Sequence, residues 1–117
     1  MRGLDLQDEF ARGIWFVRGT GILDASTIEP FNGLIDEIFR RGCYRVCLDA
    51  TRLERVSATG IGVLLAANAR AQGEGGALVL VSPPDLVQAA LDALGVSGQL
   101  TVAADPATAA RALGEWG

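Results

Sequence analysis

Residues 46–65 read VCLDATRLERVSATGIGVLL and decide the fold that this sequence predicts. An apolar run over residues 44–48 ends in Asp49 and predicts a buried strand, and the polar stretch over residues 50–56 predicts a loop. A helix then opens at Ser57. The first amides of a helix have no partner within it, and a serine hydroxyl caps such an end well. We therefore expect Ser57 to cap a helix whose first turn is exposed.

The helix that follows has one mostly apolar face. Its members recur at i, i+3, i+4 and i+7, which is the spacing of a helix that packs on a core: Ile61, Leu64, Leu65 and Asn68. Gly60 and Gly62 permit close packing of the backbone, and the sequence GEGG at residues 73–76 ends the helix. This helix is expected to lie on a sheet.

Other patterns extend the prediction outward from this helix. Residues 4–10 and 14–19 predict a hairpin of two strands. The apolar spacing over residues 24–41 predicts a helix, and Pro30 places its start at Ser26 or Thr27 because proline fits only in the first turn. The last expected elements are a strand at 77–81, a helix opening at 82–85 with Ser82 as its cap, a strand at 99–102 and a helix from Asp105 to about Leu113. Leu86, Ala90, Leu91 and Leu94 are expected to form the core face of the helix that opens at 82–85.

The order of elements is ββαβαβαβα. Strands that are separated by helices pair in parallel, so we predict an α/β fold with a mixed, mostly parallel sheet and helices packed mainly on one face. Residues 1–117 suit one domain, which is large enough to bury a core without metal or disulfides.

Composition argues against several classes of function. The net charge is −4 and no run rich in Lys or Arg occurs, so we expect no binding to nucleic acid. No apolar run approaches the ~20 residues of a membrane span, so we expect no membrane insertion. The N-terminus lacks the apolar core of a signal peptide, so we expect a cytoplasmic protein.

Catalytic and metal-binding residues are scarce. The chain has no histidine and no lysine, and its only cysteines are Cys43 and Cys47. A metal site or a catalytic constellation would need more ligands or more acid and base groups. We expect no enzyme activity, no metal and no cofactor. Asp49 is expected to anchor the residues that follow it by accepting backbone hydrogen bonds.

The segment from residue 46 resembles the central motif of the STAS domain, the family of bacterial anti-sigma-factor antagonists and related modules. In that family an apolar strand ends in Asp, and a variable loop leads to Asp-Ser-Ser-Gly and then Leu-Gly-Val-Leu-Leu. Here the corresponding residues read SATG at 57–60 and IGVLL at 61–65. The resemblance extends in outline over the whole chain and implies a STAS fold.

The resemblance also implies a change at the regulatory position. In the antagonists the second residue of the tetrapeptide is a serine that a kinase-type anti-sigma factor phosphorylates, and Ala58 stands here instead. Ser57 and Thr59 are the nearest other hydroxyls, and each has a structural alternative: a helix cap for Ser57 and a local or solvent hydrogen bond for Thr59. Both remain candidates for phosphorylation.

Two functions follow from the resemblance. The first is a regulatory module that binds a kinase-type anti-sigma factor, with the partner-binding residues Ser57, Ala58, Thr59, Gly60, Arg52, Arg55 and Ile22. The alternative is a structural adaptor subunit of a lipid-transport ATPase or a stress-signalling complex. Trp15, Phe16 and Trp116 either cap the core or form an apolar patch that supports a homodimer.

Overall fold

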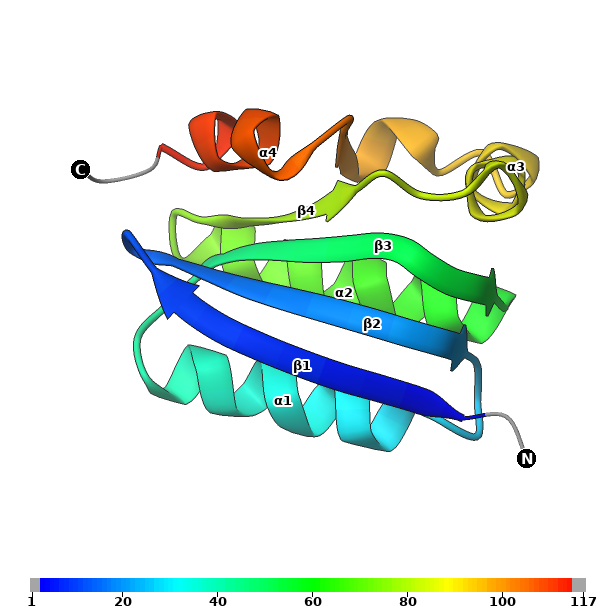
Figure 1. Cartoon of the computed structure of the whole chain (residues 1–117), viewed down its shortest axis with the longest axis horizontal. Coiled ribbons are helices and arrows are strands. Elements are labelled where there is room, and N and C mark those ends of the chain that lie inside the picture. The colour runs from blue at the N-terminus through cyan, green and yellow to red at the C-terminus, as the bar shows by residue number, and fades with distance from the viewer. Residues whose placement is uncertain (1–2, 115–117) are drawn as a thin grey trace.

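A five-stranded sheet runs through the centre of the computed structural model, which describes residues 3–114. The strands lie in sequence order, β1 and β2 are antiparallel, and the other neighbours are parallel (Figure 1). The strands are β1 (Leu4–Ala11), β2 (Ile14–Leu23), β3 (Arg45–Val56), β4 (Ala77–Val81) and β5 (Thr101–Ala103). The helices are α1 (Ile28–Arg40), α2 (Ala58–Gly73), α3 (Asp85–Ala93) and α4 (Pro106–Ala112), with a short 3-10 turn η1 (Ser97–Gln99) before β5. The predicted order and the mixed, mostly parallel sheet are confirmed.

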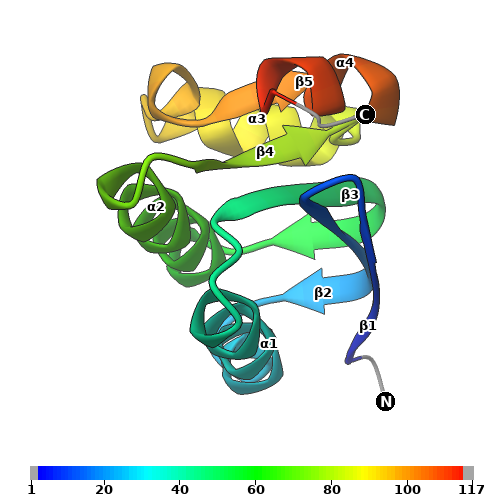
Figure 2. The same ribbon diagram turned by 90° about the vertical axis from the view of Figure 1, so that its left-hand side faces the viewer.

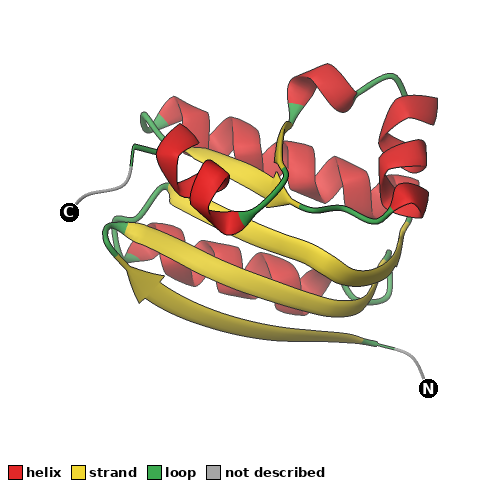
Figure 3. Cartoon of the chain, turned by 45° about the horizontal axis from the view of Figure 1, so that its top comes forward, coloured by secondary structure: helices red, strands yellow, loops and turns green. Residues whose placement is uncertain are grey.

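Successive side chains of a strand point to opposite faces of the sheet, and here the apolar ones form two cores, one on each face. On one face, Val46, Leu48 and Leu80 share a core with buried residues of α1, α2 and α3. On the other face, Cys47 and Val79 pack with α4. Figure 2 shows α1 and α2 side by side on one face, and Figure 3 shows α4 on the opposite face. Three helices therefore cover one face, as predicted, while β1 forms an edge of the sheet.

The expected loop over residues 50–56 is wrong, because β3 continues through Val56. The strand stays paired with β2, and two register shifts absorb its extra residues: Asp49 faces Arg18 and Arg52 faces Thr20, and Leu53 faces Gly21 while Arg55 faces Ile22. Such bulges leave the extra polar residues of β3 exposed, while the strand remains paired with β2. A polar strand of this kind lacks the strict alternation by which strands are recognised in a sequence.

Helix α2 is hydrogen-bonded to neighbouring elements at its start and in its second half. Near its start, the Ser57 N–H donates to the Leu23 carbonyl at the end of β2, at 3.0 Å. Further along, the buried Asn68 amide donates to the Gln99 carbonyl at 3.1 Å and accepts the Leu78 N–H at 3.0 Å. Asn68 therefore belongs to the buried face, as predicted, and joins α2 to β4 and η1.

Helix α3 differs from its prediction. It begins at Asp85 without a side-chain cap, since the Ser82 hydroxyl instead donates to the Ala104 carbonyl. Of its predicted core face, Leu91 is buried and Ala90 packs against the core, which confirms them. Leu86 and Leu94 are exposed, and Val87 is buried instead. Helix α4 follows its prediction closely, because Asp105 accepts the Thr108 N–H at 2.7 Å and Pro106 occupies the first turn.

The two early glycines of α2 differ in their surroundings. A Cβ on Gly60 would overlap the Leu23 carbonyl oxygen, whereas a Cβ on Gly62 would meet nothing within 4 Å. Gly62 is exposed, so its expected role in close packing is wrong.

Replacing each of these glycines by alanine separates the two environments. Gly60→Ala should lower the free energy of unfolding by about 2 kcal/mol, because the methyl group forces two backbones apart. Gly62→Ala should raise it by about 0.5 kcal/mol through helix propensity. Urea denaturation of both variants measures these changes, and equal effects would contradict the close approach at Gly60.

Candidate protein-docking site

The turn that opens α2 is ordered by its own cap. The Ser57 hydroxyl accepts the Gly60 N–H at 3.1 Å, which confirms Ser57 as the N-cap. Ser57 is half-buried and Gly60 is buried, while Ala58 and Thr59 are exposed on the first turn. A partner protein can therefore contact Ala58 and Thr59 directly, and Ser57 and Gly60 hold them in place.

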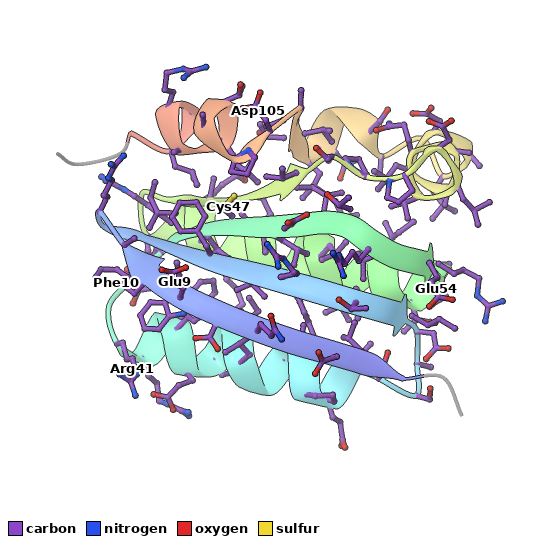
Figure 4. The ribbon with its side chains drawn as sticks, in the orientation of Figure 1. Glu9, Phe10, Arg41, Cys47, Glu54 and Asp105 are labelled. Atoms are coloured by element: carbon purple, nitrogen blue, oxygen red, sulfur yellow. The ribbon has the colours of Figure 1, made fainter. Side chains whose placement is uncertain are left out.

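The other predicted binding residues also divide into exposed ones and a buried one. Arg52 and Arg55 are exposed near the end of β3, whereas Ile22 is buried with 9% of its surface exposed. Figure 4 shows Glu54 of the same segment at the end of β3. Ile22 of β2 pairs with Arg55 of β3 in the register of the two parallel strands. The exposed part of the site thus combines the small residues of the α2 turn with three charged residues at the end of β3: Arg52, Glu54 and Arg55.

A loop whose residues were not predicted as part of the site adjoins this turn. It follows Leu23, whose carbonyl accepts the Ser57 N–H, and it contains Asp24 and Ser26. The Ser26 hydroxyl and N–H both donate to one carboxylate oxygen of Asp24, at 2.6 and 2.9 Å. These bonds, with the nearby Arg55 guanidinium, lower the pKa of Asp24. The Asp-Ala-Ser spacing is a signal of such a turn and could have been read from the sequence.

Asp49 anchors the strand next to the site. Burial raises the pKa of its carboxyl, but the hydrogen bond from Thr51 and the Arg18 guanidinium outweigh burial and leave the pKa lowered. The Thr51 N–H donates to it at 3.0 Å, and Arg18 lies 3.5 Å away. The expected role of accepting a backbone hydrogen bond is confirmed, although the bond stabilises a bulged strand rather than a loop.

Metal-binding and reactive groups do not gather near the site. Within residues 3–114, no group of three or more metal-ligating side chains occurs. Cys43 and Cys47 are free and buried, and burial raises the pKa of the Cys47 thiol to about 12. No helix in that range is long and apolar enough to cross a membrane.

The aromatic residues considered for self-association lie in different environments. Trp15 packs beside the core under α1 and α2, and its ring N–H donates to Asp8 at 2.8 Å. Phe16 packs against the core on the α4 side. Trp116 lies outside the described residues. Trp15 and Phe16 therefore point to opposite faces of the sheet and form no common patch.

Comparison with known proteins places this geometry in a family. A family model described as "Mlab, STAS domain" matches residues 16–103, from β2 to the end of β5. The chain belongs to the STAS domain family. The matched residues include the whole α2 turn.

Solved structures share the fold of this STAS domain. The anti-sigma factor antagonist SpoIIAA in its unphosphorylated form has a TM-score of 0.77 and 20% identity, over 97% of this chain and 100% of that chain. A putative anti-sigma factor antagonist from Thermotoga maritima has a TM-score of 0.83 and 16% identity, over 92% and 93%. An antagonist from Mycobacterium paratuberculosis has a TM-score of 0.84 and 15% identity, over 94% and 93%. No curated protein sequence matches this STAS domain.

The cap can be tested by comparing two neighbouring hydroxyls. Ser57→Ala should lower the free energy of unfolding by about 1 kcal/mol, because the Gly60 N–H loses its acceptor. Thr59→Ala should change it by less than about 0.5 kcal/mol, because Thr59 is exposed. Thermal denaturation of the two variants measures the difference, and a Ser57→Ala variant as stable as the native protein would contradict the cap.

Proposed function

We propose that this STAS domain is a regulatory module that binds a kinase-type anti-sigma factor through the α2 turn, as an anti-sigma-factor antagonist does. The observation that carries the proposal is the turn itself: Ala58 and Thr59 are exposed on a backbone that Ser57 and Gly60 hold rigidly. A surface ordered before binding loses little conformational entropy when a partner docks. The proposed activity is therefore binding rather than catalysis.

The two arginines beside the turn suit acidic groups on the part of the partner that meets the end of β3, where the exposed Glu54 lies between them in the sequence. Arg52 and Arg55 are exposed at the end of β3, and the start of α2 adds the partial positive charge of a helix N-terminus. Charges at the rim of an interface mainly raise the rate of association. We infer that these arginines steer the partner, while Ala58 and Thr59 provide close contact.

The proposed off-switch of this module is weak or absent. SpoIIAA, which shares the fold, has been solved in unphosphorylated and phosphorylated forms. By the resemblance of the motifs, Ala58 occupies the acceptor position, and alanine has no hydroxyl. The Ser57 hydroxyl is already used as the cap, so Thr59 offers the more accessible oxygen. A phosphate at the start of a helix is locally favourable, so its effect would fall on the partner's docking rather than on folding.

A second candidate function is a structural adaptor in a transport ATPase or a stress-signalling complex. The observation that favours it is the same exposed Ala58, since a permanent contact requires no phosphate acceptor. An adaptor would form a complex that survives dilution and would leave transcription from a sigma-dependent promoter unchanged. An antagonist would raise that transcription when it is overproduced.

The loss of the acceptor can be tested by restoring it. The native protein and the Ala58→Ser variant are incubated with ATP and the kinase-like protein that co-purifies with the native chain, and both are weighed intact. We expect one phosphate on the variant and none on the native protein, because only the variant presents a hydroxyl at position 58.

Two outcomes would count against this account. Stoichiometric phosphate on Thr59 or Ser57 of the native protein would show that a switch survives without position 58. Recovery of transporter subunits, with no kinase-like protein, would favour the adaptor instead.

A further inference from the structure

Helix α3 and its C-cap residue expose two large apolar side chains to solvent. Leu86 and Leu94 have exposed fractions of 63% and 50%, although Val87 and Leu91 already fill the core below the helix. At 3.6 residues per turn, Leu86 shares the exposed flank with Ala89 and Ala93, both also exposed, and Leu94 borders it. Leu94 is the C-cap residue and lies about 80° from Leu86 around the helix axis. Single exposed leucines are ordinary, but two within one short helix and its cap widen the apolar surface that a partner can cover.

The charges of α3 have one sign. Asp85 and Asp92 are exposed beside the apolar flank, and α3 contains no basic residue. A second copy docked symmetrically on this flank would bring the same carboxylates together, which opposes self-association. A partner with basic groups beside its apolar residues would instead match this surface in sign.

This flank lies at the same end of the molecule as the proposed docking turn. Figures 1 and 3 both place α3 at the end where β3 stops and α2 begins. Helix α2 begins at this end and exposes small, uncharged residues along one side: Ala58, Gly62, Ala66 and Ala69. Small residues permit a second helix to approach closely, and the first charged residue of α2 is Arg70.

We infer that the partner contributes an amphipathic helix, which packs its apolar stripe against Leu86 and Leu94 and places Lys or Arg residues beside Asp85 and Asp92. This inference rests on the proposed function, because it names the part of the partner that meets the same end of the STAS domain. The recognition follows the helix-in-groove mode, in which apolar residues at i, i+3, i+4 and i+7 supply the contacts.

A comparison of three exposed apolar residues tests the contact. The tagged native chain, a double variant with Leu86→Ser and Leu94→Ser, and the control Phe10→Ser are used to capture proteins from a lysate of the source cells. Phe10 is 54% exposed and lies at the opposite end of the sheet (Figure 4). The recovered partner should fall about tenfold or more for the double variant and stay unchanged for Phe10→Ser. Thermal denaturation verifies that the variants remain folded.

Photocrosslinking tests the chemistry of the contact. Leu94 is replaced by benzoylphenylalanine, with the same replacement of Phe10 as the control, and the crosslinked peptide is sequenced by mass spectrometry. We expect a segment with apolar residues at helical spacing and Lys or Arg between them, and no such crosslink from position 10. An acidic segment, a peptide from a second copy of this chain, or the absence of a crosslink at position 94 would overturn the inference.

The outcomes separate this inference from the proposed function. Unchanged capture by the double leucine variant, together with loss of capture by a Thr59→Glu variant, would leave the turn as the docking site and remove α3 from it. Failure of the native chain to capture any kinase-like protein would contradict the proposed function itself.

Discussion

The close approach of two backbones at the start of α2 is the constraint on which the rest of the structure depends. The Leu23 carbonyl at the end of β2 accepts the Ser57 N–H, and Gly60 leaves room for that carbonyl because it has no side chain. β2 and β3 are parallel neighbours, so their carboxyl ends meet at one edge of the sheet. The Asp24–Ser26 turn, the arginines of β3 and the first turn of α2 consequently form one surface.

Asn68 also joins α2 to neighbouring elements, in the second half of the helix. Its amide is buried, and both of its polar atoms are hydrogen-bonded, the oxygen to Leu78 of β4 and the nitrogen to Gln99 of η1. A buried amide that is satisfied in only one arrangement favours that arrangement over others with equal apolar contact. The helix is therefore held against sliding along the sheet, and the position of its first turn is defined relative to β4 as well as β2.

The features that the sequence predicted well are those determined by neighbours along the chain. Ser57 and Asp105 each accept an N–H three residues ahead, and the buried run of β4 needs no knowledge of its partners. The continuation of β3 was missed because β2 alone keeps its polar residues paired, through two bulges. The core face of α3 was predicted only in part: Leu91 is buried and Ala90 packs against the core, but Val87 fills the place expected for Leu86 and Leu94, which are exposed. At the site, the cap was predicted from residue type, whereas the burial of Ile22 and the proximity of Asp24 depend on tertiary contacts.

Strand β1 has a consequence for the behaviour of the protein at high concentration. It pairs with β2 on one side, and among the described strands none pairs with its other side. An open strand edge can serve as a template on which another chain adds its own strand. Here the strand carries Asp5, Asp8 and Glu9, all exposed. Two molecules that pair through this edge bring six carboxylates together. Their electrostatic repulsion opposes edge-to-edge aggregation.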